Sequence, residues 1–142
     1  MKIKLINLFL KRTFCESLPY KTGDKIVETF TITQNHVDLF STLVYDNNVI
    51  HKDCPSVVEP YVNGALLNGF VSGLIGTKLP GSGTIVLSQT FSFPNKCVVN
   101  KQIETTIELA DVRRIIRVVY ECRQLNRIVF KGEARLIVKK TF

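Results

Sequence analysis

The sequence predicts a single α+β domain in which an antiparallel sheet wraps around one long helix. Two observations support this fold class. Residues 62–79 form an apolar stretch of helical length, and residues 84–138 hold four segments rich in Ile, Val, Thr and Phe, the residues that favour strands. A helix that is apolar nearly all round must be buried on most sides, and a surrounding antiparallel sheet would bury it.

The first part of the domain is expected to contain one strand and one short helix. Residues 25–33 alternate apolar and polar side chains, as a half-buried strand does. Thr33 is a suitable cap for a helix that continues to residue 44, whose apolar residues fall on one face. The polar segment 45–60 follows and carries few signals of regular structure.

The long helix over residues 62–79 contains several glycines, each of which lowers helix propensity by about 1 kcal/mol relative to Ala. These glycines therefore suggest a close approach of backbone or ligand; they are Gly64, Gly69, Gly73 and Gly76. The run Leu79-Pro80-Gly81-Ser82-Gly83 ends this helix. Strands are then expected over residues 84–93, 101–109, 114–123 and 127–138, with breaks at Pro94-Asn95, Ala110-Asp111 and residues 124–126.

Composition excludes several classes of protein. The 142 residues suit one domain, with 45% hydrophobic and 22% charged residues as in ordinary soluble globular proteins. The cysteines are far apart, without a CxxC pair or a histidine at zinc-ligand spacing, so no metal site is expected and a reducing compartment is favoured. No apolar run reaches the roughly 18–20 uncharged residues of a membrane span.

The net charge of +7 is concentrated at the N-terminus. The first fourteen residues contain no acid and four basic residues, Lys2, Lys4, Lys11 and Arg12. A basic, acid-free stretch that is apolar between its charges is typical of a mitochondrial transit peptide. We therefore expect residues 1–20 to be a targeting segment and connector, residues 21–142 to be the domain, and the protein to reside in the mitochondrial matrix. No RNP, KH or zinc motif occurs, so a nucleic-acid partner is not expected.

The polar segment contains a pair of side chains suited to proton transfer. Asp46 and His51 lie five residues apart, next to the predicted long helix. A carboxylate and an imidazole can act as general acid and base, and backbone N–H groups where a helix begins can stabilise charge on a carbonyl oxygen. Asn63-Gly64 marks that helix start. On spacing alone, an Asp and a His in a polar loop are usually solvated or capping groups and not catalytic ones.

The wider pattern resembles the MaoC-like dehydratases and (R)-specific enoyl-thioester hydratases over residues 23–138. Asp46-x-Asn48-x-Ile50-His51 resembles their D-x-N-P-[IL]-H motif, and Asn63-Gly64-Ala65-Leu66-Leu67 stands where they have H-G-M-L. Gly23-Asp24, the L-P-G-x-G turn from Leu79 and Gly132-Glu133-Ala134 also match. Residues 66–94 resemble the mitochondrial 3-hydroxyacyl-[acyl-carrier-protein] dehydratases in particular.

This resemblance implies a hot-dog fold, in which an antiparallel sheet wraps a long central helix, and a homodimer with its active site near the dimer interface. It implies reversible dehydration of (3R)-hydroxyacyl thioesters to trans-2-enoyl thioesters in mitochondrial fatty acid synthesis. No cofactor is implied, because the substrate arrives on the phosphopantetheine of acyl carrier protein or on CoA. By carry-over, Asp46 and His51 are the catalytic pair, the Gly64 N–H polarises the thioester carbonyl, and Asn48 and Ser72 support the pocket.

The sequence departs from the family pattern at several positions without removing a proposed catalytic atom. Val49 replaces a proline, Tyr45 replaces a glycine and Asn63 replaces a histidine. Val99-Asn100-Lys101 stands where the family has a G-D turn, and the segment between His51 and Gly64 is shorter than the family's. The turn that presents His51 is therefore expected to be less rigid, and the cover of the pocket is expected to differ.

Other functions remain open at this point. An (R)-specific enoyl-CoA hydratase would use the same chemistry on CoA esters. Basic residues such as Arg113, Arg114 and Arg117 suit an acidic carrier protein or the CoA phosphates alike, and a solvated strand face explains them more simply. A hot-dog module that binds acyl thioesters without turnover is the alternative from another class. A thioesterase would need a separate nucleophile or base, for which the sequence offers no arrangement.

Overall fold

A computed structural model describes residues 19–139. The expected targeting segment lies almost wholly outside this range. Strands and helices follow one another in the predicted order, and the α+β arrangement is confirmed. The elements are β1 (Lys25–Thr31), α1 (Gln34–Val44), the short 3₁₀ helix η1 (Val49–His51), α2 (Gly64–Thr77), β2 (Thr84–Ser92), β3 (Gln102–Val112), β4 (Ile116–Gln124) and β5 (Arg127–Val138).

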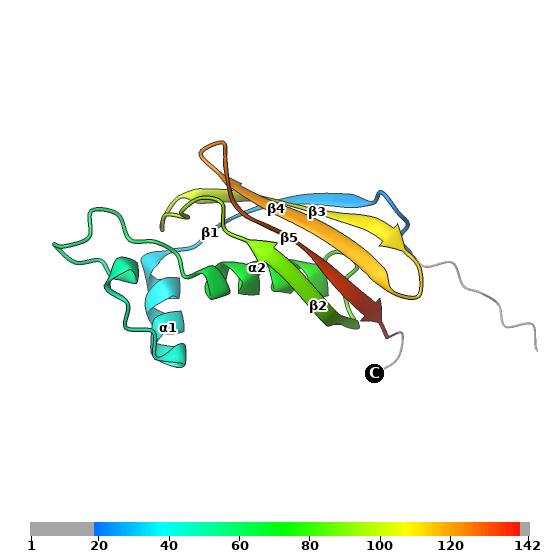
Figure 1. The fold of residues 1–142 in the computed structure, drawn as a ribbon, viewed down its shortest axis with the longest axis horizontal. Helices are drawn as coiled ribbons and strands as arrows, with labels where there is room; N and C mark the ends of the chain where they lie inside the picture. The colour runs from blue at the N-terminus through cyan, green and yellow to red at the C-terminus, as the bar shows by residue number, and fades with distance from the viewer. Residues whose placement is uncertain (1–18, 140–142) are drawn as a thin grey trace, which may run out of the picture.

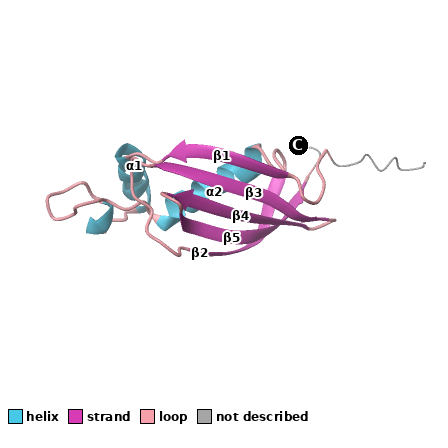
Figure 2. Ribbon diagram, turned by 90° about the horizontal axis from the view of Figure 1, so that it is seen from above, coloured by secondary structure: helices cyan, strands magenta, loops and turns pink. Residues whose placement is uncertain are grey.

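The five strands form one antiparallel sheet in the order β1-β3-β4-β5-β2, so that β1 and β2 are its edges (Figure 2). Helix α2 runs along one face of the sheet, whereas α1 lies beyond the end of the sheet with the loop that follows it (Figure 1). The connection between α1 and α2, which holds the candidate catalytic pair, is therefore outside the sheet but next to the beginning of α2.

The core lies between the sheet and one stripe of α2. Leu67, Val71 and Ile75 recur every four residues along this helix and are at most 1% exposed. The sheet meets them with alternate residues of β3 and β4, which point to the same face because successive side chains of a strand point to opposite faces. Burial of each such aliphatic side chain contributes about 1.5–3 kcal/mol. The fully buried partners on these strands include Ile103, Ile107, Leu109 and Val118.

The prediction that α2 is buried on most sides is wrong for the single subunit. The sheet covers only one stripe of the helix, and its opposite stripe is exposed at Ala65, Gly69, Ser72 and Gly73. The expected close approach at the glycines is found only at Gly64, where an added Cβ would lie 2.7 Å from Cζ of Phe93. At the other α2 glycines an added Cβ would meet no described atom within 4 Å.

The predicted break at Ala110-Asp111 is also wrong. Strand β3 continues to Val112, and the turn to β4 lies at residues 113–115. A bulge after Leu109 absorbs one residue and leaves Asp111 paired with Arg117 of β4. The Asp111 carboxylate also accepts a hydrogen bond of 2.8 Å from the Arg113 guanidinium, which holds the turn. The polar residue that suggested a turn therefore belongs to the strand.

The described cysteines are free, and two of the three are buried. Cys97 and Cys122 are buried, and burial raises the pKa of the Cys97 thiol to about 12 and that of Cys122 to about 11. Both therefore stay protonated and pack as small apolar groups. Between residues 19 and 139, no group of three or more His, Cys, Asp or Glu side chains could hold a metal ion. In the same range, neither helix is long and apolar enough to cross a membrane.

Candidate active site

Local hydrogen bonds shape the loop that carries Asp46 and His51. Helix α1 ends at Tyr45, whose left-handed conformation (φ 60°) turns the chain away from the helix axis. The Asp46 carboxylate then accepts from the Asn48 N–H at 3.1 Å, and the Asn48 side chain accepts from the Ile50 N–H at 3.4 Å as the cap of η1. These two turns bring the side chains of Asp46 and His51 to the same side of the loop.

The predicted pair is brought together. Nε2 of His51 lies 3.6 Å from Oδ2 of Asp46. The other ring nitrogen, Nδ1, lies 2.7 Å from the carbonyl oxygen of Tyr61. A carbonyl can only accept, so Nδ1 carries the hydrogen and Nε2 is the nitrogen directed at Asp46. The imidazole is 11% exposed and the carboxylate 32% exposed, so solvent or a ligand reaches the pair from the Asp46 side.

Backbone and amide groups hold His51 from three directions. Tyr61 accepts from the imidazole, and its own N–H donates to the carbonyl of Ile50 at 2.9 Å. The Gln34 side chain, at the start of α1, donates to the carbonyl of His51 at 2.8 Å. The position of the imidazole is therefore determined by α1 and by residue 61 as well as by its own loop.

Residues 97–100 connect Tyr61 and the start of α1 to the sheet. The buried Gln124 side chain of β4 accepts from the Val98 N–H at 2.8 Å and donates to the Val98 carbonyl at 2.9 Å. Tyr61 forms an isolated bridge with Val98, which places residue 61 beside the loop. Asn100 adopts a positive φ of 61°, and its side chain accepts from the Gln34 N–H at 3.3 Å. An asparagine thus makes the turn for which the family uses G-D.

Asn63 links the pair to helix α2. Its Nδ2 donates to Oδ2 of Asp46 at 2.8 Å, and the residue is only 3% exposed. Gly64, the first residue of α2, follows it directly in the chain. The bond therefore fixes the carboxylate close to the N-terminal end of this helix. The sequence marked Asn63 only as part of the helix start, and its contact with Asp46 was not predicted.

Hydrogen bonds lower the pKa of the Asp46 carboxyl below its ordinary value. The largest contribution comes from the Asn48 backbone N–H, followed by the Asn63 side chain, whereas desolvation acts in the opposite direction. Positive charge on His51 or Lys52 lowers the pKa further. Each of these groups stabilises the ionised form, so Asp46 is a carboxylate at neutral pH.

Gly64 offers a backbone donor beside the carboxylate. The first N–H groups of a helix have no intrahelical acceptor, and they stand at its positive end. Among residues 19–139, no group accepts a hydrogen bond from the Gly64 N–H. The ring of Phe93, which stacks on Phe130 with centroids 4.9 Å apart, lies against Gly64 and leaves no room for a side chain there. A larger residue at this position would have to displace the end of the Phe93 ring.

The two residues expected to support the pocket lie in different places. Asn48 is exposed and shapes the loop through the hydrogen bonds given above. Ser72 lies on the exposed stripe of α2, about two turns beyond Gly64, and its side chain forms no hydrogen bond with another residue in the range 19–139. Contact of either residue with a substrate stays a prediction.

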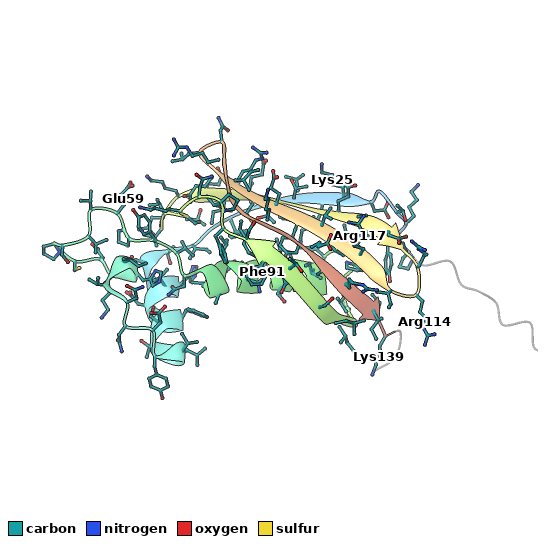
Figure 3. The ribbon with its side chains drawn as sticks, in the orientation of Figure 1. Lys25, Glu59, Phe91, Arg114, Arg117 and Lys139 are labelled. Carbon is teal, nitrogen blue, oxygen red and sulfur yellow. The ribbon has the colours of Figure 1, made fainter. Side chains whose placement is uncertain are left out.

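Two basic grooves lie at opposite ends of the sheet. One, of about 480 Å³, is lined at the β3–β4 turn by Asp111, Arg113, Arg114, Ile115, Arg117 and Arg135. The other, of about 710 Å³, borders the loop that carries Asp46 and His51 through Tyr61 and includes Glu59, Lys96, Lys101 and Arg127. Figure 3 shows Arg114 and Lys139 at one end of the molecule and Glu59 at the other, near α1. Both surfaces have an excess of positive charge.

This arrangement suits proton transfer next to a carbonyl group. A carboxylate and an imidazole nitrogen face the same point, and a helix N-terminus lies beside them. Such a site can take a proton from a carbon next to a carbonyl and return it elsewhere while N–H groups stabilise the charge on the carbonyl oxygen.

Comparisons with known proteins agree on one kind of relative. No protein-family model matches the sequence. The chain is 26% identical over 131 residues to an (R)-specific enoyl-CoA hydratase of Rhodospirillum rubrum, covering 83% of this chain and 88% of the relative. It is 29% identical over 117 residues to a 3-hydroxybutyryl-CoA dehydratase of Methylorubrum extorquens, covering 77% of this chain and 74% of that protein.

Solved structures agree with these relatives. An (R)-hydratase of Aeromonas caviae involved in PHA biosynthesis superposes with a TM-score of 0.79 and 26% identity, over 85% of this chain and 98% of that one. A MaoC-like dehydratase of Rhodospirillum rubrum shares the fold with a TM-score of 0.69 and 13% identity, over 87% of this chain and 96% of that one. The fold expected from the sequence, a hot-dog with its central helix, is thereby confirmed.

Proposed function

We propose that this chain, which is similar to (R)-specific hydratases over most of its length, interconverts (3R)-hydroxyacyl thioesters and trans-2-enoyl thioesters. The overall reaction removes one water from the hydroxyacyl thioester or adds one to the enoyl thioester. Asp46 and His51 form the acid/base pair, and Gly64 supplies the donor for the thioester carbonyl.

In this proposal the acid/base pair binds the reacting water molecule and exchanges protons with it. Oδ2 of Asp46 and Nε2 of His51, 3.6 Å apart, are both acceptors when Nδ1 carries the imidazole hydrogen, so one water molecule can donate to both. In the hydration direction the water oxygen bonds to C3 while the pair takes one of its protons. The pair then returns a proton to C2. Dehydration is the reverse: the proton leaves C2, the C3–O bond breaks and the hydroxyl departs as water.

The start of α2 stabilises the intermediate charge. Addition at C3 moves negative charge onto the thioester carbonyl oxygen, and the Gly64 N–H together with the helix dipole stabilises it there. Asn48 and Ser72 complete the pocket in this proposal. One observation carries the proposal. The Asp46 carboxylate faces His51 and also accepts a hydrogen bond from the side chain of Asn63, the residue just before Gly64.

We propose acyl carrier protein as the natural carrier of the acyl group, in mitochondrial fatty acid synthesis. The basic grooves support it, because acyl carrier proteins are acidic and present their substrate on a phosphorylated arm. The acid-free, basic residues 1–14 support a targeting segment within residues 1–20 and a place in the mitochondrial matrix. Mass spectrometry of the protein from its own cells tests the targeting segment: an intact Met1 in the mature chain would refute it.

CoA is the second candidate carrier, since two relatives are named for reactions on CoA esters. We further propose that the protein is a homodimer and that the partner covers the open side of the pair. The exposed stripe of α2 and the exposed apolar side chains of edge strand β2, Val86, Leu87 and Phe91, support this assembly.

The reaction is tested by turnover of trans-2-enoyl-CoA and of the same acyl group on acyl carrier protein, followed by the loss of conjugated thioester absorbance. Asp46→Asn and His51→Ala should each lower turnover by at least about 100-fold, because each removes one proton-transfer partner. Circular dichroism of both variants should match the unchanged protein. A higher kcat/KM on one carrier identifies that carrier.

Two outcomes would contradict this assignment. Near-normal activity in either folded variant would remove that residue from the acid/base pair. Absence of turnover on both carriers, combined with measurable thioester binding, would instead indicate a binding module that retains the residues of the family without its chemistry.

A further inference from the structure

We propose that Asn63 is a positioning residue of this site, which fixes the Asp46 carboxylate and leaves the first N–H groups of α2 free for the substrate. The inference rests on the proposed function, because it gives Asn63 a part in the same reaction. It starts from an unusual feature of α2: its N-cap side chain does not cap the helix.

Asparagine is among the residues most favoured at a helix N-cap, because its side-chain oxygen accepts from the N–H groups of the first turn. Asn63 occupies the N-cap of α2, yet its side chain makes no capping hydrogen bond. Thr33, the N-cap of α1, shows the ordinary behaviour: its hydroxyl accepts from the His36 N–H at 3.3 Å. The two helices of the described chain therefore begin in different ways.

The Asn63 side chain instead forms a hydrogen bond with the Asp46 carboxylate. Its Nδ2 donates to Oδ2 of Asp46 at 2.8 Å, and this is the oxygen that faces the His51 imidazole. The bond restrains rotation of the carboxylate at the atom that takes part in proton transfer. It also favours the ionised form, and it is the second largest contribution to the lowered pKa of Asp46.

Helix stability does not explain this orientation. Asn63 is 3% exposed, and its Oδ1 is buried without a hydrogen-bond partner among residues 19–139. Buried side-chain oxygens in folded proteins are nearly always satisfied, and capping would satisfy this one. The amide thus leaves both its own oxygen and the helix start unpaired while it binds Asp46.

The missing cap has a direct consequence for the substrate. A capping oxygen would accept from the N–H of Ala65 or Leu66 and place negative partial charge beside the Gly64 N–H. Without it, these N–H groups stay free and the positive end of α2, where the Gly64 N–H faces the thioester carbonyl in the proposed reaction, is not neutralised. The orientation of the Asn63 side chain therefore affects both the Asp46 carboxylate and the N-terminal end of α2.

Two substitutions separate this role from a structural one. Asn63→Asp keeps the size and the capping ability of the side chain but replaces its donor by a second carboxylate beside Asp46. Asn63→Ser keeps capping ability and is too short to reach Asp46. Both variants can cap α2, which offsets part of the stability lost with the Asp46 bond, so both should remain folded at the assay temperature, as thermal unfolding would verify.

Both variants should lose kcat/KM by about tenfold or more, chiefly through kcat, with the larger loss for Asn63→Asp. The acidic limb of the pH profile should move to higher pH, because loss of the donor raises the pKa of Asp46 and protonates the carboxylate earlier as the pH falls. Unchanged kcat/KM and an unchanged acidic limb in both folded variants would overturn the proposal.

A measurement without turnover keeps the inference independent of the proposed function. The Asp46 carboxyl carbon can be titrated by NMR in the full chain, with Asp46→Asn to assign its signal. Its pKa should rise in Asn63→Ser and rise further in Asn63→Asp. Equal Asp46 titration in all three proteins would refute the role of Asn63 even if the enzyme is active. If the unchanged protein shows no turnover, the proposed function is refuted. The titration of Asp46 would still decide whether Asn63 stabilises its ionised form.

Discussion

Tyr45 and Asn100 both adopt left-handed backbone conformations next to the candidate site, with φ values of 60° and 61°. Asparagine tolerates this region, and Asn100 also uses its side chain to accept from the Gln34 N–H. Tyr45 has no such compensation, since its side chain is 87% exposed. A non-glycine residue in this region costs about 1–2 kcal/mol, so Tyr45 strains the chain at the residue before Asp46.

Tyr45→Gly should therefore stabilise the protein. Relief of the left-handed conformation is partly offset by the greater backbone entropy of glycine in the unfolded chain, so we expect a gain of about 0.5–1 kcal/mol in the free energy of unfolding. Urea denaturation followed by circular dichroism measures this gain. Turnover should be nearly unchanged, because the tyrosine side chain contacts solvent.

Asn100→Gly is the matched comparison, since it removes a side chain at the same backbone conformation but also breaks the hydrogen bond to Gln34. It should give no gain in stability. A loss of stability in Tyr45→Gly would show that the tyrosine ring makes stabilising contacts that outweigh its backbone strain.

The Asp46–His51 pair was predictable, and most of the groups that hold it were not. Asp46 and His51 stood out because a carboxylate and an imidazole are side chains that can transfer protons. The Tyr61 carbonyl, which orients the imidazole, is a backbone atom that any residue type supplies. Asn63 was assigned to the helix start because asparagine favours that position, and nothing in its identity indicates that it binds a carboxylate instead.

At the scale of elements, the tightest backbone approach in the sheet is at Gly132 of β5. A Cβ added there would lie 2.4 Å from the carbonyl oxygen of Thr90 and 2.6 Å from the hydroxyl of Tyr120. The Tyr120 hydroxyl accepts from the Gln89 amide at 2.8 Å, and Gln89 also bonds Asn68 of α2. The absence of a side chain at Gly132 thus makes room for a polar chain that joins the sheet to the helix.

Gly132→Ala should destabilise the fold by about 1–3 kcal/mol, since the β2 backbone cannot move aside without breaking its pairing with β5. Chemical denaturation with the unchanged protein as reference measures the loss. Gly69→Ala is the control, because an added Cβ at Gly69 meets no described atom within 4 Å. Equal stability of Gly132→Ala and the unchanged protein would mean that β2 and β5 adjust without cost.

The elements themselves were largely predictable, because alternation of apolar and polar residues and the cap at Thr33 depend on neighbouring residues only. The boundary errors have tertiary causes. A bulge in β3 carried the strand past Ala110-Asp111, and a bulge depends on the register with β4. The exposure of one stripe of α2 depends on how far the sheet curls, which no local pattern reports.

At the scale of the whole molecule, the edge strand β2 exposes apolar side chains to solvent in the single subunit. Strand β2 lies at the edge of the sheet, and Val86, Leu87 and Phe91 on it are each at least 40% exposed. Unpaired edge strands with apolar side chains promote association with another chain. The proposed homodimer would pair or cover this edge.

Leu87→Lys should shift the proposed dimer to monomers, because the lysine places a charge in the contact. Light scattering coupled to gel filtration measures the mass, and turnover should fall if the partner completes the site. Leu125→Lys is the control: Leu125 is 72% exposed at the β4–β5 turn, away from β2, and its substitution should leave the mass unchanged. A monomeric unchanged protein with full turnover would refute the dimer.

The hydrogen bonds around residues 53–58 have a consequence for how this enzyme can diversify. Within the described chain, the hydrogen bonds of this stretch join its residues to one another, and Val58 is 98% exposed. The imidazole is held by groups on either side of the stretch, the carbonyl of Tyr61 and the amide of Gln34. The length and composition of this stretch can therefore change without moving the imidazole of His51.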